Sequence, residues 1–153
     1  MNSAFEFARA TRKRIAETVQ SLSIEQLNLI PAGCNNNIAW HLGHIVVSTE
    51  LLCYIRSEVK LNQEIPLQEK YRNGTRPDAW IHQTEIDYML SRLMPSLDNI
   101  EADYKAGLFG TISPYSTHTF GVEMSSIEEV FMAASHHDVL HAGNIGIMKR
   151  LVA

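Results

Sequence analysis

The sequence predicts an all-α protein, a four-helix bundle with long crossover connections. Four long segments place apolar residues at helical spacing, and no segment of comparable length alternates like a strand. Two long irregular stretches, near residues 58–76 and 105–124, separate the later helices. Connections of that length permit parallel neighbours, so the helices need not run simply up and down. A chain of 153 residues fits a single domain, residues 1–153.

The first helices are indicated by an apolar stripe and a capping motif. A long helix is predicted over about residues 2–22, whose apolar residues share one face: Phe5, Ala8, Ile15, Val19 and Leu22. Ser23 and Gln26 have the spacing of a capping box and predict a short extra helix. This helix should end before Pro31.

The second and third long helices are bounded by asparagines and prolines. The second begins in residues 35–37, where three Asn side chains can cap a helix, and runs to about Ser57. The third opens near Pro77, a residue suited to the first helical position, and continues to about Tyr104. Pro95 should kink or split it, because proline lacks an N–H and clashes with the preceding turn.

The fourth helix is predicted from overlapping capping boxes to the end of the chain. The segment "SSIEE" pairs Ser125 with Glu128 and Ser126 with Glu129. The apolar periodicity then continues to the last residues.

Composition narrows the classes of function. The net charge of −4 and the lack of a basic cluster argue against nucleic acid as a partner. We expect no membrane span, because no apolar run reaches about 18 residues, and no secretory signal, because charges run through the N-terminal segment. Cys34 and Cys53 are too few for a disulfide framework. A cytoplasmic protein with buried thiols is expected.

The fourth helix carries histidines on its predicted inner face. Residues spaced by four and three form a heptad seam: Val130, Ala134, His137, His141, Asn144 and Met148. His136 lies about 100° away and is interpreted as a flanking residue. His137 and His141 therefore face the bundle interior on consecutive turns, about 6 Å apart at the backbone.

The second long helix offers a further inward histidine. Its inward stripe consists of Trp40, His44, Val47, Leu51 and Tyr54. His41, nearly one turn before His44, is interpreted as a polar residue at a partly exposed edge. His82 and His118 have no cluster around them and should be surface rings.

Three buried imidazoles indicate a metal site. An unpartnered buried imidazole costs a few kcal/mol or is held neutral by a lowered pKa, and a shared metal ion offsets that cost. A His-x-x-x-His pair with a third ligand from a facing helix gives three neutral nitrogen ligands, which suit Zn, Ni, Co or Fe. The alternative is a set of core histidines hydrogen-bonded to carbonyl groups.

Two other metal-site patterns fit less well. The segment "HDVLH" differs from the zinc-protease pattern H-E-x-x-H by one methylene, at Asp138. The downstream segment "AGNIGIMKRLVA" holds no further ligand, which argues against that class. A ferritin-like di-iron bundle requires E-x-x-H pairs, and neither Glu128 nor Glu129 has that spacing to His136 or His137.

Two segments carry a resemblance to a known family. "NNNIAWHLGHIVVSTE" and "HHDVLHAGNIG" resemble the two signature segments of the DinB-like (DinB/YfiT-like) superfamily of metalloenzymes. The first signature, Asn-x-Ile-x-Trp-x-x-x-His, falls on Asn36, Ile38, Trp40 and His44. The second, His-x-x-x-His-x-Gly-Gln, falls on His137, His141, Gly143 and Asn144. The stretches "NGTRP" and "TFGVEMSSIEEV" are similar to family connections, and the family is similar in length to the whole chain.

The resemblance implies a crossover bundle with one divalent transition metal bound by His44, His137 and His141. Ni or Zn is implied first, with Fe as the third candidate, and a homodimer is common. Asn144 replaces the family Gln, which puts its hydrogen bond to the site in doubt. Asn144, Trp40 and His41 are the candidates for supporting or pocket residues.

Several functions follow from this resemblance. Relatives use the metal to activate a low-molecular-weight thiol, so we expect a metal-dependent thiol S-transferase or hydrolase that acts on a small molecule. No residue pattern names a general base, so the catalytic groups beyond the metal and its water or thiolate ligand are unknown. The competing expectations are a non-catalytic, stress-related bundle with a structural metal and a small-molecule binding protein. Gly43 and Gly143 are expected to let helices approach closely.

Overall fold

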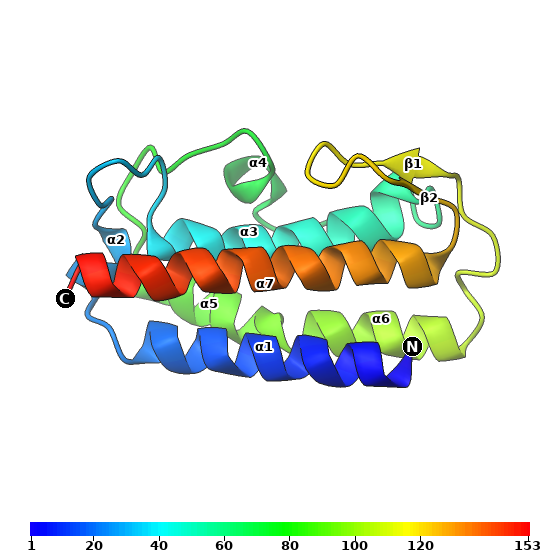
Figure 1. The fold of residues 1–153 in the computed structure, drawn as a ribbon, viewed down its shortest axis with the longest axis horizontal. Coiled ribbons are helices and arrows are strands. Elements are labelled where there is room, and N and C mark those ends of the chain that lie inside the picture. Colours follow the sequence, from blue (N-terminus) through cyan, green and yellow to red (C-terminus); the bar gives the residue numbers. More distant parts are fainter.

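Four helical rods make up the structure, a computed structural model that describes residues 1–153 (Figure 1). The long helices are α1 (Asn2–Gln20), α3 (Ile38–Glu50), α5 (Gln83–Leu93) followed by α6 (Pro95–Lys105), and α7 (Ile127–Leu151). The short helices are α2 (Ile24–Asn28), the π-helical continuation η1 (Leu51–Arg56) of α3, and α4 (Gln68–Tyr71). An antiparallel pair of two-residue strands, β1 (Tyr115–Ser116) and β2 (Glu123–Met124), completes the fold. The predicted all-α class is confirmed.

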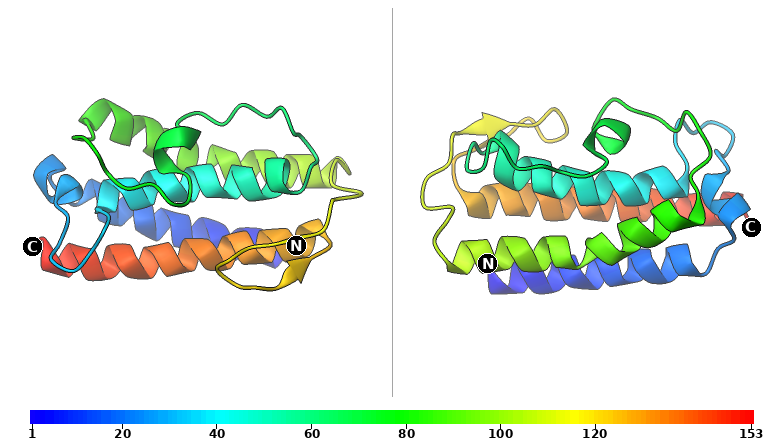
Figure 2. Two further views of the ribbon diagram at one scale, coloured as in Figure 1. Left: turned by 90° about the horizontal axis from the view of Figure 1, so that it is seen from above. Right: turned by 180° about the vertical axis from the view of Figure 1, so that it is seen from behind.

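The helices do not alternate in direction. α1 and α7 run side by side the same way, and α3 and α5–α6 run together the opposite way (Figures 1 and 2). The connection over residues 57–82 makes this possible, because it carries the chain back along the bundle to the end at which α3 began. The second connection, residues 106–126, crosses from α6 to α7 at one end. Only the first is a crossover along the full length of the bundle.

The predicted caps account for where three helices begin. The Ser23 hydroxyl accepts from the Gln26 backbone N–H while the Gln26 side chain accepts from the backbone of Ser23. Asn37 caps α3 by accepting from the backbone N–H of Trp40 at 2.8 Å. Ser126 forms the capping box of α7 with Glu129. The alternative box of Ser125 with Glu128 is not formed; both donors of Ser125 contact Glu129 instead.

The third long helix differs from its predicted start. It begins at Gln83 rather than near Pro77. The amide of Asn28 explains the difference, since it donates to the carbonyl of Ile81 and accepts from its backbone N–H, at 2.9 and 2.8 Å. This pairing holds the chain before the helix in a non-helical conformation. The predicted break at Pro95 is confirmed, because α5 ends at Leu93 and α6 begins at the proline.

α3 is the core helix of the bundle. All thirteen of its residues are buried. The helical segment Ile38–Arg56 is long and apolar enough to cross a membrane by length and composition, although no apolar run of that length was expected. However, 83% of its most apolar window is buried among the other helices, so those side chains serve the core. The chain over residues 57–82 covers the outer side of this helix (Figure 2).

A buried ion pair joins the four rods at the middle of the bundle. Arg12 on α1 is fully buried, and its Nε donates to Oδ2 of Asp138 on α7 at 2.7 Å. The other guanidinium nitrogens donate to the Leu93 carbonyl and to the Thr49 hydroxyl, each at 2.6 Å. Burial raises the pKa of the Asp138 carboxyl, and Arg12 opposes that rise. Asp138 therefore stabilises the fold as the partner of Arg12. This role further argues against Asp138 as the general base of a zinc protease.

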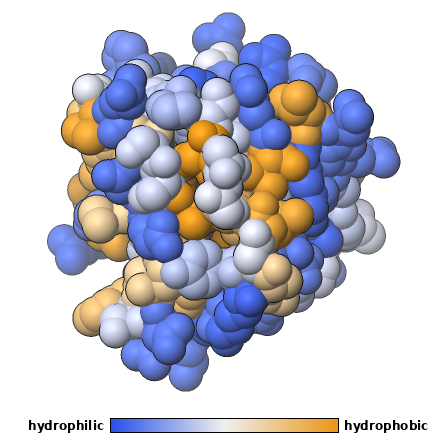
Figure 3. All heavy atoms as spheres, turned by 90° about the vertical axis from the view of Figure 1, so that its right-hand side faces the viewer, coloured by the Kyte–Doolittle hydropathy of each residue, from blue (hydrophilic) through white to orange (hydrophobic).

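The second connection closes the end of the bundle at which α1 and α7 begin. Phe109, Ile112 and Met124 from this connection are buried in a cluster with Phe5 and Phe131. Viewed onto this end, apolar atoms show in the middle of the face and hydrophilic side chains surround them (Figure 3). Anchoring of this kind fixes the segment between β1 and β2, which lies beside the site described next.

Candidate metal centre

Three histidine rings converge between α3 and α7. The antiparallel helices α3 and α7 are in contact, and His44 on α3 faces both His137 and His141, which lie one turn apart on α7. The Nε2 atom of His137 lies 3.2 Å from Nε2 of His44 and 3.1 Å from Nε2 of His141. One ligand atom from each of the three rings can be chosen so that all lie within 4.8 Å of one another. The three predicted ligands are therefore brought together.

Hydrogen bonds at the far side of two rings orient the converging nitrogens. Nδ1 of His44 donates to the carbonyl oxygen of Tyr71 at 2.6 Å, so its Nε2 carries a lone pair. Nδ1 of His141 lies 2.7 Å from Nδ1 of His41, and one of these two atoms must carry the shared proton. When His141 is the donor, its Nε2 also presents a lone pair to the centre. Such outer contacts are typical of histidines that bind metals.

Burial favours the neutral form of these rings. It lowers the pKa of His41 and of His137 to about 4 and that of His141 to about 2, and it lowers the pKa of His44 as well. The neighbouring imidazoles lower the first three further by mutual repulsion. Neutral imidazoles are the form that binds a metal ion, so the donor set fits a divalent ion such as Zn or Ni.

The Trp40 ring supports His44 from the adjacent turn of α3. The two rings are stacked, with centroids 4.5 Å apart and planes 12° from parallel. The indole Nε1 donates to the hydroxyl of Thr75 at 3.0 Å, and Thr75 lies in the crossover. The hydroxyl of Ser48 lies 3.3 Å from both ring nitrogens of His44. Trp40, predicted as a supporting or core residue, is therefore buried against a candidate ligand.

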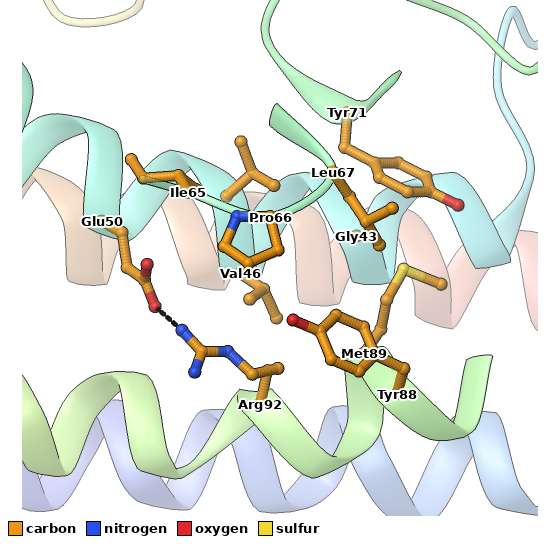
Figure 4. Close-up of a pocket in the computed structure, with 11 residues that line it drawn as sticks. Gly43, Val46, Glu50, Ile65, Pro66, Leu67, Tyr71, Tyr88, Met89 and Arg92 are labelled. Carbon is orange, nitrogen blue, oxygen red and sulfur yellow. Dashed lines mark hydrogen bonds and ion pairs between the residues drawn. The ribbon is translucent and has the colours of Figure 1, made fainter. Parts of the chain in front are cut away.

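The missing side chain at Gly43 leaves a notch in α3, and the packing of Tyr71 into this notch positions its backbone carbonyl. A Cβ atom on Gly43 would lie 2.6 Å from Cγ and Cδ1 of Tyr71 and 2.7 Å from the sulfur of Met89, so only glycine fits (Figure 4). The Tyr71 hydroxyl donates to Glu85 on α5. The ring is thus held at both ends while its backbone carbonyl accepts from His44. The predicted close approach at Gly43 is confirmed, and the two neighbours are the ring of Tyr71 on the short helix α4 and the sulfur of Met89 on α5.

His41 differs from the sequence interpretation. It was expected at a partly exposed edge, yet only 4% of its surface is exposed and it contacts His141. The expectation of exposure is wrong because the crossover and α7 cover that side of α3.

Two other residues near the second signature also differ. Asn144 is exposed and forms no side-chain hydrogen bond, so its predicted inward position is wrong and the structure does not bring it to the site. The environment of Gly143 is open, with no atom within 4 Å of a Cβ placed there, so the close approach expected at this glycine is not found. His136 and His82 are exposed, in agreement with their interpretation as flanking and surface rings.

A cleft of about 320 Å³ opens above the histidine cluster. His44 and His137 lie in its wall, together with Ser48 of α3. The crossover supplies Arg72 and Asn73, η1 supplies Arg56, and the segment between β1 and β2 supplies residues 117–120. His118, interpreted from sequence as a surface ring, is exposed and lines this cleft. No spacing in the sequence relates it to the other histidines, so only the fold reveals its position.

The bundle and its cluster define a helical protein whose three histidines could hold a divalent metal ion at the wall of a small cleft. The sequence model of the DinB superfamily matches residues 8–145, and the chain belongs to this superfamily. Proteins of this family bind metals, in agreement with the cluster.

A solved structure shares the fold. It is described as the conserved protein of a locus from Enterococcus faecalis, with 19% sequence identity and a TM-score of 0.58. The match covers 99% of this chain and 95% of the other. At this identity the similarity concerns the fold alone. Comparison with curated protein sequences found no match.

Proposed function

We propose that this protein is a metal-dependent enzyme that acts on a small thiol, as a thiol S-transferase or, alternatively, a hydrolase. The convergence of the His44, His137 and His141 nitrogens at the wall of a cleft of small-molecule size carries the proposal. A divalent ion held there would lower the pKa of a thiol or water molecule and supply a nucleophile at neutral pH.

The chain's own residues contribute position and access. The Tyr71 carbonyl and His41 orient the rings of His44 and His141. Trp40 and the crossover cover the buried side of the cluster, so the cleft beside His44 and His137 leaves one open approach for a substrate. This asymmetry favours a site that binds a molecule over one that only crosslinks two helices, because a structural site is normally closed by protein ligands.

A structural metal site is the second candidate function. No carboxylate lines the cleft. The buried acids that adjoin cleft residues in the sequence are both engaged in ion pairs, Asp138 with Arg12 and Glu50 with Arg92. No acidic residue of the cleft is therefore present to act as a general base. In this alternative the cluster would stabilise the bundle and catalyse nothing.

Metal content and thiol conjugation together test the proposal. Protein purified without chelators is analysed for metal, and about one divalent ion per chain is expected. Conjugation of 2-mercaptoethanol, cysteine and glutathione to 1-chloro-2,4-dinitrobenzene is then measured; the thiolate sulfur forms the new bond to the ring and chloride leaves. The variants His44→Ala, His137→Ala and His141→Ala should lose both metal and activity. His136→Ala, an exposed position on the same helix, is the matched control.

Two results would contradict the enzyme proposal. Protein that carries no stoichiometric metal and takes up none would remove the metal-dependent function altogether. Protein that binds metal, conjugates no thiol and loses only thermal stability in the three variants would establish the structural alternative.

A further inference from the structure

The cleft above the histidine cluster is lined by positively charged side chains and by no negatively charged one. Two arginines line it, Arg56 from η1 and Arg72 from the end of α4, and His118 lies on the opposite segment. None of its fourteen lining residues is acidic, although the chain as a whole carries 17 acidic and 13 basic residues. The positive charge is therefore local to the cleft, and a cleft with low-dielectric walls concentrates such a field.

Arg56 is held in place without a carboxylate partner. Its guanidinium lies over the ring of Tyr115, 5.0 Å from the centroid, and Nη2 donates to the Ser116 carbonyl at 3.2 Å. The Tyr115 hydroxyl in turn donates to the Leu52 carbonyl at 2.7 Å. These contacts orient the guanidinium by stacking and use only one of its five donor N–H groups.

Arg72 retains most of its donors for a ligand. Its single ion pair runs from Nε to Glu69 at 2.9 Å, and the Glu69 side chain is 79% exposed. An exposed pair three residues apart contributes little and does not compete strongly with a ligand. Neither Nη atom of Arg72 forms a hydrogen bond within the protein.

Some other polar side chains of the cleft form no hydrogen bond within the protein. The hydroxyl oxygen of Thr117 is buried and has no hydrogen-bond partner, which is uncommon for a buried polar atom. Asn73, Ser116 and Thr119 add further polar side chains to the lining. A ligand with several oxygen acceptors would satisfy this arrangement.

We propose that the cleft binds a small organic anion through its carboxylate groups, with Arg56 and Arg72 as the residues that recognise them. Carboxylates accept paired hydrogen bonds from guanidinium groups, which makes arginine well suited to this role. The inference rests on the proposed function and refines it: the thiol substrate carries carboxylates at the arginines and presents its sulfur to the wall formed by His44 and His137.

Two pairs of probes test the recognition of charge. Calorimetric titration of the chelator-treated and zinc-loaded protein compares succinate with its neutral diamide, succinamide. In the cobalt-loaded protein, the thiolate-to-cobalt absorption band compares mercaptosuccinate with the neutral thioglycerol. We expect each anion to bind about tenfold more tightly than its neutral counterpart, the usual size of a charge-assisted contact that is partly exposed.

Arginine variants assign that preference to the cleft. Arg56→Gln and Arg72→Gln should each remove most of the preference for the anion, while Arg56→Lys should retain part of it. Arg76→Gln, at an exposed position outside the cleft lining, is the matched control and should change nothing. Circular dichroism and thermal unfolding confirm that each variant is folded.

The outcomes separate this inference from the proposed function. Equal affinity for charged and neutral probes, or a preference that survives in both glutamine variants, would overturn the inference even if thiols gave a cobalt band. Absence of any cobalt band, with a preference for succinate that depends on the arginines, would contradict the thiol function and leave the anion site intact.

Discussion

The Nδ1 atoms of His41 and His141 lie 2.7 Å apart, so a single proton joins the two rings. His41 sits on α3 and His141 on α7, and the contact therefore links the two helices that form the cluster. The shared proton decides which nitrogen of His141 is free to face His137. The His41 imidazole thus orients the ring of His141, as the Tyr71 backbone carbonyl orients the ring of His44.

Replacement of His41 should weaken metal binding more than folding. In His41→Phe the ring of His141 loses its partner and turns more freely, so metal affinity should fall by about 10- to 100-fold. Competition with a chromophoric chelator measures the affinity, and thermal unfolding of the metal-free protein measures the structural effect. His136→Phe is the control. If the metal-free variant unfolds much earlier while affinity is unchanged, His41 is a packing residue only.

The notch at Gly43 should be equally sensitive. Gly43→Ala places a methyl group against the Tyr71 ring and the Met89 sulfur, so Tyr71 must shift and its carbonyl leaves His44. We expect a loss of about 1–3 kcal/mol in the free energy of unfolding together with weaker metal binding. Urea denaturation and chelator competition measure the two effects.

Gly143→Ala is the matched control for that substitution. A Cβ atom at Gly143 meets nothing within 4 Å, and the residue lies inside α7. The change should therefore stabilise the protein by up to about 1 kcal/mol, since alanine is the better helix former. A destabilised Gly143→Ala protein, or an unaffected Gly43→Ala protein, would contradict the account of the notch.

The sequence was sufficient to predict the three converging histidines but not their surroundings. The spacing of His137 and His141 depends only on helix geometry, and a third inward ring on a facing helix follows from the periodicity of α3. Whether a loop covers a helix is a property of tertiary structure. For this reason His41 was expected at an exposed edge, and the positions of Tyr71 and His118 had no local signal.

The misplacement of Asn144 has a geometric cause. A strict heptad drifts by about 20° per repeat from the face of a straight α-helix. Asn144 lies two heptads after Val130 and is therefore turned about 40° from it around the helix, away from the buried face. The buried face of this part of α7 includes Ala134 and Met148 of the predicted seam together with Asp138 and Ile145, which lie on the side of the seam away from Asn144. His137 and His141 lie at the margin of this buried face and are half-buried, and His137 lines the cleft.

The ion pair of Arg12 with Asp138 yields a prediction on stability. Asp138→Asn leaves the guanidinium buried without its counter-charge and should cost about 3–5 kcal/mol in the free energy of unfolding. The double variant Arg12→Met with Asp138→Leu removes both charges and should recover much of that loss. Guanidinium denaturation measures both. Equal losses in the single and double variants would show that shape, not charge, matters at this position.

We propose that the exposed apolar side of α7 is the surface of a homodimer. Val139, Ile147 and Leu151 are about half exposed and lie on one side of this helix, at spacings that are multiples of four residues. Ile147→Glu should convert a dimer to a monomer in sedimentation analysis. Phe7→Glu alters an exposed apolar residue on α1 and is the control. A wild-type monomer, or a dimer that survives Ile147→Glu, would contradict this assignment.

The histidine cluster should make the metal-free protein sensitive to mild acid. The pKa of His41 and His137 is about 4 in the folded protein, against 6.5 for an ordinary histidine. Between these values the unfolded chain binds protons that the folded chain does not, so stability rises with pH across this window and falls as the pH is lowered through it. Above about pH 6.5 both states are neutral at these rings and the contribution is constant.

The size of this effect follows from the number of rings. Each ring that titrates only in the unfolded state contributes a slope of about 1.4 kcal/mol per pH unit. Urea denaturation of the chelator-treated protein from pH 7.5 to about 4 measures that slope. The double variant His41→Phe with His137→Phe should show a slope shallower by about two such contributions, whereas the exposed His82→Gln variant should follow the wild type. Parallel curves for the wild type and the double variant would mean that these imidazoles are protonated in the folded protein, which would argue against the neutral donor set that a metal ion requires.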